Sequence, residues 1–264
     1  MGIFREPINA VTVCHHYGDF FKIAAAYNHN LFDRWVVVTG KDDLETQEVC
    51  RQQRLTCVIS EDHNRDGGFS KGRMIERGLQ HLPADGWILH IDADIVLPQS
   101  FRRDLERSHL EPDCIYGWDR IMLKSWDDWK KLEASGWIQN TSGWWHPHGV
   151  EFPSGYQVGA RWAGGDGWVP IGFACFWHRR GSGEEWRGAR MGAYPQGHSD
   201  STREDVQKGL QFDRRKRVFI PEIICAHLES DVKSKVGANW KGRTTPWFGP
   251  PEKEPKGTDE KKAK

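Results

Sequence analysis

The chain has 264 residues, enough for one full-sized domain, and its 37 basic and 37 acidic residues leave a formal net charge of zero. This balance excludes the strong positive field of a protein that binds nucleic acid non-specifically, while a local basic patch is still open. No apolar run approaches the roughly 20 residues that span a bilayer, and the first residues lack the apolar core of a signal peptide, so we expect a cytoplasmic protein.

Strand-like and helix-like stretches alternate through the first hundred residues. Apolar, β-branched runs predict strands, and the stretches between them carry apolar residues at helical spacing. The expected strands are 10–14, 34–39, 55–59 and 87–91, and the expected helices are 19–28, about 43–53 and 71–81. Because this alternation is typical of βαβ units, it predicts an α/β fold, Rossmann-like, with a mostly parallel central sheet flanked by helices.

The stretch 118–194 has a different composition. It is rich in Gly, Trp, His and Pro and weakly periodic, which predicts an irregular region or a mixed sheet beside the first half. The fourteen tryptophans of the chain suit stacking on sugar rings and bases, and equally suit a core. A helix at 202–212 and a strand at 217–225 follow, and the polar tail 250–264 is expected to be disordered.

An acidic triplet, Asp92-Ala93-Asp94, directly follows the strand expected at 87–91. Ligands of parallel sheets bind beyond the carboxyl ends of the strands, so the triplet lies where a site is expected. On a continuing strand alternate side chains share a face, so both carboxylates could point the same way. A Mg²⁺ or Mn²⁺ ion would then satisfy them; the alternative is a pair of residues that caps a turn.

Four sequence pieces occur in the order and spacing of a known enzyme family. They are Phe69-Ser-Lys-Gly-Arg-Met-Ile-Glu-Arg-Gly-Leu79, Gly86-Trp-Ile-Leu-His-Ile-Asp-Ala-Asp-Ile-Val-Leu-Pro98, Arg203-Glu-Asp-Val-Gln207 and Ala226-His-Leu228. Over residues 8–245 the chain resembles the GT-A glycosyltransferases, particularly the family-two-like group. The resemblance implies one GT-A catalytic domain at 1–249, with a nucleotide-binding half at 8–117 and an irregular Trp/Gly-rich acceptor half at 118–249.

The resemblance also implies metal-binding and catalytic roles. Asp92 is expected to contact the ribose and the metal, and Asp94 to bind the metal. His227 follows an apolar strand and is expected to complete the metal shell; the alternative is a structural histidine. Asp205 is the expected general base for the acceptor hydroxyl, although it also fits a capping box at a helix start. Glu204, beside it, is expected to contact the substrate.

The turns after the first two strands are expected to hold the nucleotide. By the resemblance, Thr12, Cys14 and Tyr17 cradle the base and ribose. Asp42 or Asp43, after the second strand, would accept a hydrogen bond from a uracil N3–H.

Cations are expected to meet the diphosphate. Lys71 and Arg73 are placed near the phosphates, and each is equally well explained as a solvated surface charge. Lys241 and Arg243 lie where many relatives have a flexible segment that closes over the diphosphate. An ordinary basic surface turn is the alternative.

The middle region is expected to build the acceptor side, with Trp145 in the acceptor pocket and Asp166 on the hydroxyls of the donor sugar. The resemblance therefore implies transfer of a sugar from a nucleoside diphosphate sugar, with a UDP-sugar expected, to a hydroxyl group, using Mn²⁺ or Mg²⁺ and inverting the anomeric carbon. The acceptor is a saccharide or glycan, or else a hydroxymethylated DNA base of phage type, flipped out of the duplex. A nucleotidyltransferase that makes a sugar nucleotide and a non-catalytic sugar-nucleotide-binding module are the alternatives.

Overall fold

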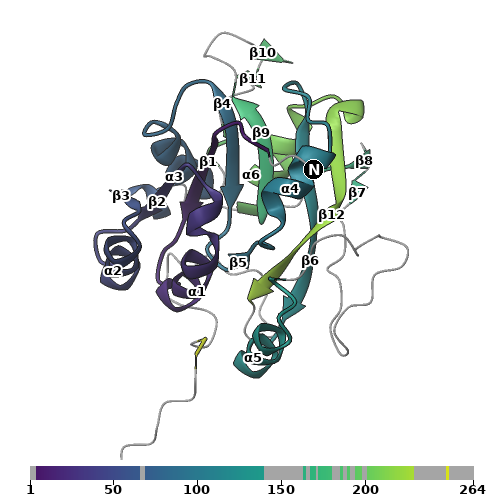
Figure 1. The fold of residues 1–264 in the computed structure, drawn as a ribbon. Coiled ribbons are helices and arrows are strands. Elements are labelled where there is room, and N and C mark those ends of the chain that lie inside the picture. The colour runs from purple at the N-terminus through teal and green to yellow at the C-terminus, as the bar shows by residue number, and fades with distance from the viewer. Residues whose placement is uncertain are drawn as a thin grey trace, which may run out of the picture.

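The computed structural model describes residues 4–65, 69–139, 163–164, 167–170, 172–179, 185–186, 189–190, 194–197, 201–228 and 248–249. Its main feature is an eight-stranded sheet with helices on both faces (Figure 1). In spatial order the strands are β3 (Thr56–Ile59), β2 (Arg34–Thr39), β1 (Ile8–Val13), β4 (Gly86–Ile91), β9 (Ala174–Arg179), β6 (Ile115–Leu123), β12 (Arg217–Leu228) and β5 (Ile95–Val96). Two short ribbons pair β7 (Ala163–Gly164) with β8 (Gly167–Trp168) and β10 (Glu185–Trp186) with β11 (Ala189–Arg190).

The first half of the sheet is wholly parallel. β1 pairs in parallel with both β2 and β4, and β2 pairs in parallel with β3. β1 is buried along its whole length, which fits its nearly unbroken apolar sequence. The α/β fold with a mostly parallel sheet flanked by helices is therefore confirmed, and the carboxyl ends of these strands lie at one edge.

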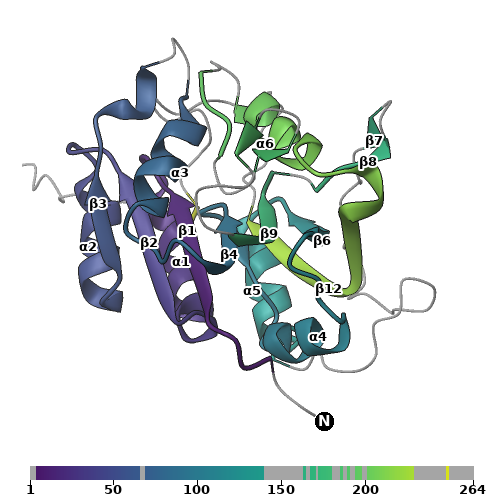
Figure 2. The same ribbon diagram turned by 90° about the horizontal axis from the view of Figure 1, so that it is seen from above.

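Helices lie on both sides of the sheet around β1 (Figure 2), and alternate residues of β1 belong to different core clusters. Ala10 packs in a cluster with Phe21 and Val49, whereas Val11 packs in a cluster with Met74. In the described ranges the helices are α1 (Gly18–Asn28), α2 (Leu44–Gln53), α3 (Lys71–Leu79), α4 (Phe101–Arg107), α5 (Trp126–Ala134) and α6 (Ser201–Leu210), with 3-10 turns at η1 (His29–Leu31), η2 (Asp62–Asn64) and η3 (Arg214–Lys216). The first cluster lies under α1 and α2, and the second under α3.

The described part of the second half adds three strands, β6, β9 and β12, to the central sheet. β9 enters the sheet between β4 and β6 and is antiparallel to both, with Ile91 opposite Ala174. β6 and β12 are parallel, with a register shift between Phe219 and Ile224, and β5 closes the edge. β9, which lies within the weakly periodic stretch 118–194, thus joins the central sheet, and residues 140–162 of that stretch lie outside the described residues.

Tryptophans serve chiefly as core residues in the described part of the chain. Trp35, Trp87, Trp118, Trp129, Trp137 and Trp177 are all buried. Within the described ranges, no helix has the length and apolar character needed to cross a membrane.

A charged residue is also enclosed in the core. Lys208 on α6 is completely buried; its ammonium lies 4.3 Å from the centre of the Trp177 ring and donates to Gln211 Oε1 at 3.2 Å. Burial lowers the pKa of Lys208 to about 7, against the opposing effect of Glu76.

Lys208 should therefore make a contribution to stability that rises with pH. Between pH 7 and the ordinary lysine pKa of 10.5, the unfolded chain holds a proton at Lys208 that the folded chain has lost. The part of the free energy of unfolding that depends on Lys208 should increase across this window by up to ~1.4 kcal/mol per pH unit. Urea unfolding at several pH values should show the wild type gaining stability relative to Lys208→Met as the pH rises, because the titration of groups common to both proteins, such as the buried cysteines, cancels in this difference. The exposed Lys131→Met controls for loss of a lysine, and identical pH dependence in all three proteins would contradict the prediction.

Candidate active site

A buried lysine joins distant segments at the carboxyl edge of the sheet. Lys71 begins α3, and its side chain is 7% exposed. Its Nζ lies 2.8 Å from Asp92 Oδ1 and 3.0 Å from Asp205 Oδ2, and it donates to the Gly172 carbonyl at 3.0 Å. Burial opposes the charge, but Asp205 and Asp92 outweigh it and raise the pKa of Lys71. The predicted phosphate cation therefore lies between two predicted site carboxylates.

Asp205 is held by groups outside its own helix. Its Oδ2 faces Lys71, and its Oδ1 accepts a hydrogen bond from the Tyr194 hydroxyl. Burial raises the pKa of Asp205, although Lys71 acts in the other direction. A Cβ atom on Gly172 would lie 1.8 Å from Asp205 Oδ2, so this approach requires glycine. Because α6 begins at Ser201, Asp205 lies beyond the first turn, and these contacts differ from a capping box.

Glu204 connects α6 to the start of α3. It is completely buried, and its Oε2 accepts a hydrogen bond from the Gly72 backbone N–H at 2.7 Å. Helix N-termini have unpaired N–H groups and favour a negative charge, so the carboxylate stabilises the turn that carries Lys71. Packing is close here, since a Cβ atom on Gly72 would lie 1.8 Å from the Pro195 carbonyl oxygen. The substrate contact expected of Glu204 stays a prediction beside this structural contact.

Asp94 and His227 come together through the pairing of β5 with β12. His227 is opposite Ile95, and the Leu228 backbone N–H donates to the Asp94 carbonyl at 2.8 Å. His227 Nε2 then lies 3.3 Å from Asp94 Oδ2, while His227 Nδ1 lies 3.2 Å from Met122 Sδ. The other carboxylate oxygen, Asp94 Oδ1, is buried and has no hydrogen-bond partner. A carboxylate and an imidazole thus face each other at the end of the sheet.

The acidic triplet turns instead of continuing the strand. β4 ends before Asp92, whose Oδ1 lies against Lys71 and 3.4 Å from His90 Nε2. Lys71 and His90 hold the pKa of Asp92 well below its usual value, against the effect of burial. In the described part of the chain, the groups of three donors within 4.8 Å of one another do not include Asp92 with Asp94 and His227. The two carboxylates therefore have separate partners.

Residues expected around the base and ribose are engaged in packing. The Thr12 hydroxyl donates to the Ile91 carbonyl at 2.8 Å and accepts from Trp35 Nε1 at 2.9 Å. Cys14 is buried, which raises its pKa, with its Sγ 3.1 Å from Thr46 Oγ1. The ring of Tyr17 is stacked on the ring of Phe20. Nucleotide contacts from these side chains stay predictions.

The two aspartates after β2 have different environments. Asp43 is buried and caps the N-terminus of α2, and it accepts hydrogen bonds from the Thr46 backbone, from the hydroxyls of Thr46 and Thr39, and from the His16 backbone. The Asp42 side chain is 64% exposed and lies 3.1 Å from His16 Nε2. Of the two, Asp42 has the accessible carboxylate.

Of the remaining predicted site residues, one lies on α3 and four lie outside the described part of the chain. Arg73 is in the first turn of α3, near Lys71 in sequence and partly buried. Trp145, Asp166, Lys241 and Arg243 lie outside the described residues.

Sequence reasoning missed several residues of this edge. Tyr194 and Gly172 fix Asp205, and His90 lies beside Asp92. The position of His90 in the strand expected at 87–91, two residues before Asp92, was the available signal for it. A single tyrosine and a glycine in a glycine-rich region carry no comparable pattern.

No family model and no curated protein matches this sequence. Solved structures give weak similarities. Glucosyl-3-phosphoglycerate synthase from Mycobacterium tuberculosis in complex with Mn²⁺, UDP-glucose and phosphoglyceric acid has a TM-score of 0.47 and 10% identity, over 88% of this chain and 74% of that one. The same synthase with Mn²⁺, UDP and glucosyl-3-phosphoglycerate gives 0.46 and 13%, over 84% and 72%. Mannosyl-3-phosphoglycerate synthase from Rubrobacter xylanophilus gives 0.35 and 17%, and this chain spans only 40% of its length.

Proposed function

We propose that the chain is a metal-dependent glycosyltransferase of the GT-A type that transfers a sugar from a nucleoside diphosphate sugar, a UDP-sugar in particular, to an acceptor hydroxyl. The observation that carries this proposal is the buried Lys71 ammonium, which joins Asp92 to Asp205 at the edge where Asp94 faces His227. A donor-binding carboxylate, a base and a pair of metal donors would then share one end of the sheet, where ligands of such sheets bind.

The Asp94–His227 pair fits a divalent cation. The buried Asp94 Oδ1 lacks a hydrogen-bond partner, and a cation would satisfy it. One carboxylate and one neutral imidazole leave the other coordination positions of a Mn²⁺ or Mg²⁺ ion open for phosphate oxygens. A bound ion would supply Lewis acidity to the leaving diphosphate. Asp92 would contact the ribose.

Asp205 is the proposed general base, which takes the proton of the acceptor hydroxyl. In the reaction, the acceptor oxygen bonds to the anomeric carbon, the bond from that carbon to the phosphate oxygen breaks, and the hydroxyl proton passes to Asp205. Direct attack on the face opposite the leaving group would invert the anomeric carbon. Burial raises the pKa of Asp205 and so makes its carboxylate a better proton acceptor than a surface aspartate, while Lys71 holds it in place. The acceptor is a saccharide or glycan hydroxyl, or the hydroxyl of a hydroxymethylated DNA base.

Asp94→Asn tests the metal role. UDP and Mn²⁺ together should raise the Tm of the wild type more than either alone, because the ion joins the diphosphate to the protein. The variant should lose this joint effect, and its rate of sugar transfer should fall by about 100-fold or more. Differential scanning fluorimetry and UDP release from a UDP-sugar measure both quantities. The exposed Asp127→Asn is the matched control; a full joint effect in Asp94→Asn would refute the assignment.

A further inference from the structure

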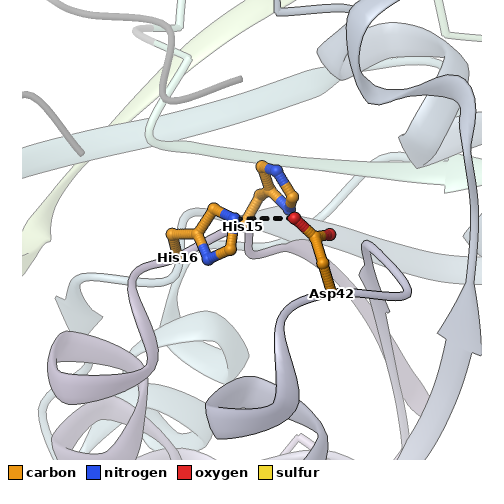
Figure 3. Close-up of side chains that lie close together, drawn as sticks. All are labelled: His15, His16 and Asp42. Carbon is orange, nitrogen blue, oxygen red and sulfur yellow. Dashed lines mark hydrogen bonds and ion pairs between the residues drawn. The ribbon is translucent and has the colours of Figure 1, made fainter. Parts of the chain in front are cut away.

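Two histidines and an aspartate gather at the ends of β1 and β2, away from the Asp94–His227 pair in sequence. His15 and His16 follow β1, and Asp42 lies in the turn after β2 (Figure 3). A ring nitrogen of each histidine and a carboxylate oxygen of Asp42 lie within 4.8 Å of one another. The closest pair is His16 Nε2 and Asp42 Oδ2, at 3.1 Å. Donors on one tetrahedral zinc ion lie about 3–3.5 Å apart, a separation that His16 and Asp42 already have.

Packing alone does not explain the cluster. His15 is 3% exposed and its Nδ1 has no hydrogen-bond partner, although buried polar atoms normally have one. The ring of His63 is stacked on that of His15 with 4.2 Å between centroids, and Nδ1 of His63 is likewise buried and unpartnered. Imidazole nitrogens that lack hydrogen bonds are available as metal ligands.

His15 and Asp42 converge on the same point. A Cβ atom on Gly40 would lie 2.7 Å from His15 Nδ1 and 2.7 Å from Asp42 Oδ1. The absence of a side chain at Gly40 therefore lets a nitrogen and an oxygen donor approach one small space. An alanine at this position would put a methyl group there.

The turn that carries the donors is held in place. His16 has a φ of 58°, a left-handed conformation uncommon for residues other than glycine. Its backbone N–H donates to Asp43 Oδ2 at 2.7 Å, and Asp43 in turn caps the N-terminus of α2. Strained backbone conformations of this kind cluster at binding sites. The side chain of His16 is thereby directed toward Asp42 by a fixed backbone.

We propose that His15, His16 and Asp42 form a second metal site, which binds a divalent transition ion of the zinc class. Two imidazoles and one carboxylate are a donor set that Zn²⁺ and Co²⁺ accept in tetrahedral geometry, with one position left open. The set is richer in nitrogen than the Asp94–His227 pair proposed for Mn²⁺ or Mg²⁺. An open pocket of about 500 Å³ adjoins Asp42, so the fourth position would face solvent. The pocket is lined by Lys41, Asp42, Glu61, His63 and Asn64.

Co²⁺ titration of the metal-free full chain tests this site directly. The wild type should bind Co²⁺ with the visible absorption of a tetrahedral complex, and Zn²⁺ should displace it. His16→Ala and Asp42→Asn each remove a ligand from a partly exposed side chain, so both should fold and bind Co²⁺ at least about tenfold more weakly. Gly40→Ala should weaken binding in the same way, because its methyl group enters the site. Circular dichroism establishes that each variant is folded.

Two controls separate this site from the rest of the protein. Asp94→Asn alters the proposed transferase site, and His81→Ala removes an exposed histidine elsewhere; both should keep the wild-type Co²⁺ spectrum. Wild-type affinity in His16→Ala and Asp42→Asn would overturn the proposal, as would loss of the spectrum in Asp94→Asn. If Asp42→Asn instead weakens only the binding of UDP to metal-free protein, Asp42 belongs to the nucleotide site and the proposal is also overturned. None of these readouts needs sugar transfer.

Discussion

Replacing Lys71 with methionine is expected to inactivate the protein and to lower its free energy of unfolding by about 3–5 kcal/mol. Methionine approximates the length of the lysine side chain but removes the charge. Asp92 and Asp205 would then remain near each other without the ammonium that now lies 2.8 and 3.0 Å from them. Breaking a buried ion pair on one side costs more than the pair contributes, because an uncompensated charge is left behind.

Urea unfolding and a double-mutant cycle measure this effect. Lys41→Met, at an exposed position after β2, controls for the loss of a lysine and should have little effect on unfolding. Lys71→Met combined with Asp205→Asn should be less destabilised than the sum of the single changes, by about 0.5–3 kcal/mol, since the second change removes one of the stranded anions. Additive effects would mean that Lys71 does not bridge the carboxylates.

The parallel half of the fold could be predicted because three of its four strands, β1, β2 and β4, are almost wholly buried. The strand expected at 34–39 has the observed bounds of β2, Arg34–Thr39, and its sequence is nearly all apolar. β9 could not be predicted in the same way. Its six residues include cysteine, tryptophan and histidine, which fit loops as well, and its pairing with β4 joins residues 83 to 93 positions apart. Nothing local in the sequence encodes that pairing.

The site was predictable in its residue types and less so in its contacts. Lys71, Asp92 and Asp205 were each expected near the substrate, but their mutual ion pairs depend on how α3, α6 and β9 pack together. Position at a strand end did not reveal which way a polar side chain points. Thr12 donates a hydrogen bond within the sheet and Asp43 caps a helix, whereas Asp42 is exposed. A short polar side chain at a strand end is compatible with an internal hydrogen bond and with exposure to a ligand, and its tertiary neighbours decide between the two.

Asp205→Asn should slow sugar transfer by about 10²- to 10⁴-fold while leaving UDP binding with Mn²⁺ nearly intact. Asparagine has nearly the same shape and can still accept the hydrogen bond from Tyr194, but it cannot take a proton from the acceptor hydroxyl. Single-turnover transfer measures the chemical step, and fluorimetry with UDP and Mn²⁺ measures binding. Loss of both together would give Asp205 a structural role through Lys71.

The adjacent carboxylate supplies the matched control for that experiment. Glu204→Gln changes a buried acid on the same helix, but its amide oxygen can still accept from the Gly72 N–H, so the start of α3 is kept. Its rate should stay far above that of Asp205→Asn. The pH profile adds a second test: a base must be ionised, so the wild-type rate should fall as the pH falls through the pKa of Asp205, which burial raises above 3.8. This acidic limb should vanish in Asp205→Asn, and its persistence there would assign the proton transfer to another group.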